Sequence, residues 1–331
     1  MMGFRSSRSV VWAWVSSSLL ASGCALSSNR ADSPSRAAMA DRLSGKSAQV
    51  PVEDVPYQAR ENVDAPFRKR IMVLPILRGS SAFSDANLDM ARQSFIRALT
   101  KNSEVMVISE LDLKQDVASF REGDRFDLEK ISKLASPMGV TSVVELSIDK
   151  LESKRLSDPV GLVRGVRLKL ALEMKVRAAN TKNNTLLIDE TFRSDLEEVT
   201  TQIASRSRSD QNLYDDPQLT QMVLAKALIQ VRPRILQNLE KLSWEGRIAL
   251  VKGERIYINA GRLSGLQVGD ILKISEDGED VFDPETGRFI GRVPGRLKGT
   301  VEVVSYFGKD GSVSVVHSGS GFKENDLVEV Y

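Results

Sequence analysis

The sequence predicts an α+β fold, a mixed sheet with helices on one face, followed by a small all-β SH3-like barrel. Between residues 70 and 242, apolar runs alternate with amphipathic segments, as in strands and helices that pack in layers. Residues 166–177 alternate with period two, so one face of a long strand is expected to be buried. After Ser243 the chain changes to short strands with glycine-rich turns, which predicts the barrel.

The α+β part is expected to open with a buried strand in the apolar run 71–77, which has Pro75 near its end. Ser84 can cap the following helix, because its hydroxyl can accept from a free amide of the first turn. Further expected elements are a strand at 105–108, a brief helix near 113–120, a helix from Asp124 to before Pro137, and a strand at 140–148.

The clearest strand covers residues 166–177, and a turn at Asn183-Asn184 leads to its predicted partner at 185–192. Four basic residues share the exposed face of this strand: Arg167, Lys169, Lys175 and Arg177. A solvated face is the first interpretation, and a binding surface is the alternative. The strand also has about the length of a transmembrane β-strand, but its partner alternates poorly and no Trp or Tyr girdle flanks it, which favours a soluble, half-buried strand.

Residues 200–216 are polar and predict a mobile loop. Pro217 then begins a long helix whose apolar stripe runs to Leu242, and Pro233 is expected to kink it. In the barrel part, strands are expected at 246–251, 255–260, 270–275, 289–293, 299–307, 312–317 and 326–330. Segments 266–274 and 322–330 repeat one pattern, in which a turn residue and an aspartate precede an alternating strand.

The amino terminus predicts export and lipidation. A basic start precedes the apolar segment 10–20, and Ala21-Ser22-Gly23 lead to Cys24, as in a bacterial lipobox. Cys24 is therefore expected to carry acyl chains, such as palmitate, that anchor the chain; an ordinary cleaved signal is the alternative. Ala25 follows instead of the aspartate that marks inner-membrane retention, which favours the outer membrane. The expected organisation is a signal peptide at 1–23, a tether at 24–66, the α+β domain at 67–242 and the barrel at 243–331.

The composition excludes several kinds of site. The chain has 46 basic and 44 acidic residues, one cysteine and one histidine. This balance argues against a nucleic-acid partner, and a single cysteine allows neither an internal disulfide nor a Cys/His zinc cluster. His317 lacks partners that would tune it, and Asp283 and Glu285 belong to a predicted tight turn. We therefore expect a protein that is not an enzyme and that has no metal or cofactor.

Residues 244–331 resemble the carboxy-terminal domain of the flagellar assembly protein T family. The resemblance lies in Gly246-Arg247-Ile248, Ile256-Tyr257-Ile258-Asn259, Gly265 to Asp270, Asp283 to Gly287 and Ile290-Gly291. More loosely, residues 70–242 are similar to the middle part of that family and to TolB amino-terminal and curli-secretion-channel folds. The resemblance implies a periplasmic scaffold or assembly factor of a flagellar-motor ring, with envelope proteins as partners and a candidate homo-oligomeric ring. The alternatives are a curli-type channel subunit and, with no identified site, an envelope hydrolase.

Overall fold

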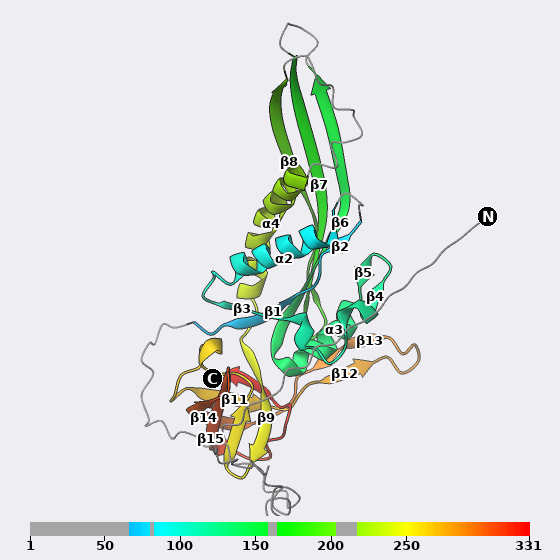
Figure 1. The fold of residues 1–331 in the computed structure, drawn as a ribbon. Coiled ribbons are helices and arrows are strands. Elements are labelled where there is room, and N and C mark those ends of the chain that lie inside the picture. The colour runs from blue at the N-terminus through cyan, green and yellow to red at the C-terminus, as the bar shows by residue number, and fades with distance from the viewer. Residues whose placement is uncertain (1–65, 80–82, 158–163, 203–216) are drawn as a thin grey trace, which may run out of the picture. The chain divides into compact units, whose positions relative to one another are not determined.

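A computed structural model describes residues 66–79, 83–157, 164–202 and 217–331 (Figure 1). Cys24, nearly all of the predicted tether and most of the predicted loop at 200–216 lie outside these residues. The described residues all belong to one compact unit, Val52–Tyr331. The predicted fold class is confirmed, because this unit contains a mixed sheet with helices and a closed six-stranded antiparallel barrel.

The sheet joins a parallel half to an antiparallel half. Its strands are β1 (Lys69–Val73), β2 (Leu77–Arg78), β3 (Val105–Ile108), β6 (Val140–Ser157), β7 (Arg164–Asn180) and β8 (Leu186–Gln202). The order is β3-β1-β6-β7-β8, with β1 parallel to β3 and β6, and β7 antiparallel to both of its neighbours. β2 pairs with β6 beyond the end of β1, because Pro75 interrupts the predicted single strand.

Helices cover both faces of this sheet, which refines the expectation of one covered face. α2 (Asp85–Leu99) and α4 (Pro217–Glu240) pack on the face that carries Ile71 and Met174. The shorter α3 (Leu128–Ala135) covers the face that carries Met72. As predicted, Ser84 caps α2, and its Oγ accepts from the Asn87 amide at 3.2 Å. None of the described helices combines the length and the hydrophobicity that crossing a bilayer requires.

The predicted brief helix at 113–120 is found in part, as a 3₁₀ helix at Val117–Phe120 that follows another at Glu110–Asp112. A small hairpin, β4 (Arg121–Glu122) and β5 (Arg125–Phe126), then precedes α3. β6 and β8 extend well past their predicted ends, since both pair with β7 along nearly its whole length.

The barrel closes in the order β10-β15-β14-β11-β16-β9. Its strands are β9 (Glu245–Lys252), β10 (Arg255–Ile258), β11 (Ile271–Ser275), β14 (Leu297–Phe307), β15 (Gly311–Gly319) and β16 (Leu327–Val330). The strand predicted at 289–293 is β13 (Phe289–Val293), but it lies outside the barrel. It forms a hairpin with β12 (Glu279–Phe282), a strand that the turn residues at 277–278 concealed.

The repeat seen in the sequence is a structural repeat. Asp270 accepts from the Gln267 amide at 2.8 Å, and Asp326 accepts from the Lys323 amide at 2.7 Å. The residue before each aspartate, Gly269 or Asn325, has a left-handed backbone. Glycine and asparagine tolerate this conformation best. The two identical corners lead into β11 and β16, which pair with each other in the barrel wall.

Candidate functional site

The basic residues of β7 do not form a bare positive stripe where the structure describes them. Carboxylates on the neighbouring strands pair with three of them: Lys169 with Glu197 at 3.2 Å, Lys175 with Asp189 at 2.9 Å, and Arg177 with Glu145 at 3.6 Å. The side chain of Arg167 lies outside the described part. Because charges of opposite sign alternate across the strands, this face is close to neutral. Its role as an interaction face stays a prediction.

The other residues that the sequence singled out lie apart from each other. His317, on β15, is exposed, and its Nδ1 lies 3.1 Å from the Thr300 hydroxyl. Asp283 accepts from the Glu285 and Thr286 amides in its turn, and the Thr286 hydrogen bonds above all hold its pKa below the usual range. Across the described ranges, no three His, Cys, Asp or Glu side chains are grouped as metal ligands.

A buried arginine joins the sheet to the barrel. Arg70, on β1, is 4% exposed and donates to Ser264 Oγ at 2.8 Å and to Asp310 Oδ2 at 3.1 Å, both in barrel loops. It also donates to the carbonyl oxygens of Met138 and Asn259. Burial lowers the pKa of Arg70, and the attraction of Asp310 opposes this shift. The cation is thus held by a set of acceptors that only the docked barrel completes.

A second arginine crosses the junction in the opposite direction. Arg247, on β9, donates to Ser136 Oγ in the turn after α3 at 2.7 Å and to Asp277 Oδ1 at 2.7 Å. Nearby, Asn259 Nδ2 donates to the Pro137 carbonyl at 3.2 Å. Both arginines are inaccessible, so the junction is a structural feature and not a binding surface. It sets how the sheet and barrel surfaces are oriented within one unit.

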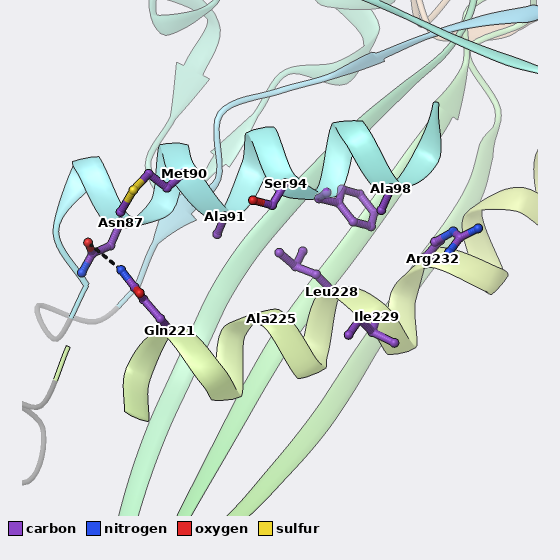
Figure 2. A pocket seen from close by; sticks show the side chains of 11 residues that line it. Asn87, Met90, Ala91, Ser94, Ala98, Gln221, Ala225, Leu228, Ile229 and Arg232 are labelled. Atoms are coloured by element: carbon purple, nitrogen blue, oxygen red, sulfur yellow. Dashed lines mark hydrogen bonds between the residues drawn. The ribbon is translucent and has the colours of Figure 1, made fainter. Parts of the chain in front are cut away.

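An apolar groove of about 460 Å³ lies between α2 and α4 (Figure 2). The two helices run side by side, and each presents residues at spacings of four, three and four positions. Phe95 and Leu228 lie in this groove among small side chains; the full lining is Asn87, Met90, Ala91, Ser94, Phe95, Ala98, Gln221, Ala225, Leu228, Ile229 and Arg232. Hereafter these residues are called the α2–α4 groove.

The groove has polar ends and apolar rims. At one end Gln221 Nε2 donates to Asn87 Oδ1 at 3.2 Å, and at the other end lies Arg232 (Figure 2). Met90 is 52% exposed and Ile229 is 70% exposed, although both are large and apolar. Arg232 has a buried Nε without a hydrogen-bond acceptor among the described residues. An apolar partner surface that carries a carboxylate would match this arrangement.

The sequence predicts the buried stripe of α4 but not this groove. The stripe from Leu224 to Leu239 is buried, as predicted. A signal for the groove was present in Ile229, an apolar residue on the polar side of its helix, and in the small residues Ala91 and Ala98 on α2. Only the packing of α2 beside α4 brings these positions together.

Comparisons with known proteins add likenesses of fold. No family model and no curated protein matches the chain. One solved structure that matches is a lipoprotein from Neisseria meningitidis, which is 12% identical in sequence and has a TM-score of 0.25. The match covers 53% of this chain and 99% of that chain. A minor lipoprotein from Acinetobacter baumannii has 10% identity, coverages of 52% and 94%, and a TM-score of 0.26. Lipoprotein B from Nitrosomonas europaea has 11% identity, coverages of 56% and 94%, and a TM-score of 0.25. At these values the likenesses do not establish a function for this chain.

Proposed function

We propose that this chain is a non-enzymatic lipoprotein of the bacterial envelope, anchored through Cys24 to the periplasmic face of the outer membrane, where it acts as a scaffold or assembly factor. The observation that carries this proposal is the apolar segment 10–20 followed by small residues and the chain's one cysteine. The α2–α4 groove supports a binding role, since its exposed apolar rims are the kind of surface that proteins use for association.

The complex that we propose is a periplasmic ring associated with the flagellar motor, and the alternative is a curli-type secretion channel. The sequence pattern of the barrel favours the flagellar ring. Two residues that carry part of that resemblance, Arg247 and Asn259, also hydrogen-bond the barrel to the turn after α3. A module that is docked in this rigid way suits a scaffold.

The anchor is tested by labelling cells with radioactive palmitate and separating their membranes on a sucrose gradient. The native chain should incorporate label and sediment with the outer membrane, while Cys24→Ser should incorporate none. Ser27→Ala is the matched control and should behave as the native chain does. A native chain without label, or label retained in Cys24→Ser, contradicts the proposal.

The complex is tested separately by deleting the coding sequence. Reduced motility and incomplete motor rings in cryo-tomograms are expected, with recovery when the native chain is supplied again. Intact rings and normal motility would exclude the flagellar role. Loss of curli secretion in the same cells would favour the alternative.

A further inference from the structure

Besides the groove, the described residues expose a second apolar surface, on the β12–β13 hairpin. In this hairpin Glu279 pairs with Val293 and Val281 pairs with Gly291, so these four residues share one face. Val281 is 39% and Val293 is 56% exposed, and Ile290, at the irregular position beside them, is 65% exposed. Glu279, Val281, Gly291 and Val293, with the exposed Ile290 that borders them, are hereafter called the hairpin face.

The opposite side of the hairpin holds it against the rest of the chain. Arg292 donates to the Gly278 carbonyl at 3.0 Å and to the Lys182 carbonyl at 3.2 Å. Its cross-strand partner Asp280 lies 3.7 Å from Lys133 on α3. Because side chains alternate along a strand, these inward contacts direct Val281 and Val293 outward. The hairpin face is therefore a fixed apolar surface and not the inner side of a loose arm.

The hairpin face and the α2–α4 groove belong to opposite sides of the same molecule. The hairpin contacts α3, which covers one face of the sheet, whereas α2 and α4 cover the other face. The sheet separates the two surfaces, so the hairpin face of one copy cannot reach the groove of that same copy. A second copy is needed to bring the two surfaces together.

The charges at the two surfaces are complementary. Arg232, at the end of the groove, has no ion pair with any described residue, and the same holds for Glu279 on the hairpin face. Each surface thus combines exposed aliphatic side chains with one unpaired charge, and the signs are opposite. Contacts of this kind gain specificity from the charge pair and most of their free energy from the buried apolar side chains.

We propose that copies of this chain associate head to tail, with the hairpin face of one copy seated in the α2–α4 groove of the next, Glu279 beside Arg232. Since the two contacting surfaces differ, the contact repeats from copy to copy and builds a ring if the rotation closes. Confinement to a membrane would raise the local concentration of copies and so favour a small contact. The contact itself does not need the anchor, so the two proposals fail or succeed independently.

Disulfide trapping tests the contact in the full chain carrying Cys24→Ser, which has no other cysteine. Ile229→Cys and Ile290→Cys are prepared separately in detergent and then mixed under mild oxidation. A covalent dimer should form in the mixture and not in either variant alone. Leu250→Cys, at an exposed apolar site on β9, is the matched control and should give no dimer with either variant.

Two outcomes overturn the proposal. Covalent dimers of Ile229→Cys alone would show that the grooves of two copies contact each other. If the mixture forms no covalent dimer and the protein sediments as a monomer, the groove has another occupant. Charge exchange adds a test of the pairing. Arg232→Glu or Glu279→Arg alone should weaken the association about tenfold or more, and combining both changes should restore it. Failure of the combined variant to recover, with its unfolding midpoint unchanged, refutes the proposed pairing.

Discussion

Replacing Arg70 by methionine is expected to weaken the junction between sheet and barrel. The methionine side chain fills most of the space of the arginine stem, so little cavity is created. What is lost is the guanidinium, which donates to Ser264, Asp310 and the two carbonyl groups at the junction. Asp310, whose side chain is 11% exposed, would then be a largely buried carboxylate without its cation.

The expected loss of unfolding free energy in Arg70→Met depends on the hydrogen-bond donors that Asp310 keeps. Removing one member of a buried ion pair costs about 3–5 kcal/mol, because the other charge stays uncompensated. Asp310, however, still accepts from the Gly261 amide at 2.9 Å and from the Ser264 amide at 3.1 Å. Because these amides still stabilise the charge of Asp310, we expect the loss of unfolding free energy to lie near the lower limit, about 3 kcal/mol.

Urea unfolding followed by tryptophan fluorescence and by circular dichroism measures this loss. Trp244 is buried at the junction, 5.7 Å from Phe67 between ring centres, and it is the one tryptophan after residue 24. In Arg70→Met the fluorescence transition should shift to lower urea. A double-mutant cycle with Asp310→Asn should show a coupling of about 1–3 kcal/mol. An Arg70→Met midpoint equal to that of the native chain would refute the inferred role of the junction.

Three further changes can be measured by the same unfolding assay. Gly139→Ala should lower the free energy of unfolding by more than Gly123→Ala does. Both glycines have a positive φ, but only at Gly139 would an added Cβ meet the Arg70 side chain, at 2.7 Å. Equal effects of the two substitutions would exclude that contact as the cause. Burial raises the pKa of Glu145, so the folded state binds its proton more readily than the unfolded chain, and stability should fall as pH rises from the ordinary carboxyl pKa through the raised one. Burial also raises the pKa of Glu245, so Glu145→Gln should reduce this slope without abolishing it, and an unchanged slope would contradict a contribution from Glu145. Leu224→Ala, in the core, should lower the free energy of unfolding by about 2–5 kcal/mol. Ile229→Ala, at the groove rim, should change the stability of the monomer by less than about 0.5 kcal/mol. Similar losses at both sites would contradict the assigned burial.

The elements that could be predicted are those whose signals are local. Ser84 and Pro217 mark the starts of α2 and α4 by cap chemistry that needs no tertiary contact. The outer part of β6, residues 149–157, has many charged residues and gave no strand signal. It is a strand because β7 supplies its hydrogen-bonding partner, and such pairing overrides a weak local preference.

The junction and the groove could not be predicted, for a different reason. Asp310 has the sequence of a turn residue, between Lys309 and Gly311, and its partner Arg70 is 240 positions away. Nothing in either segment alone distinguishes a buried ion pair from two solvated charges. In the same way, Glu279 and Val293 lie in a polar, turn-rich stretch, and their exposure on one face appears only when β12 pairs with β13.

The junction also links the stability prediction to the proposed association. The hairpin face extends from the barrel and the groove belongs to the sheet, so Arg70 helps to fix the orientation of one surface relative to the other. A head-to-tail contact that must close a ring needs that orientation to be the same in every copy. In a Cys24→Ser chain that carries both Ile229→Cys and Ile290→Cys, and can therefore link to a neighbour at each end, Arg70→Met should leave the first disulfide-linked dimer intact and reduce the yield of higher closed species. If closed species form undiminished while the junction is measurably weakened, the orientation is set by the contact itself and not by the junction.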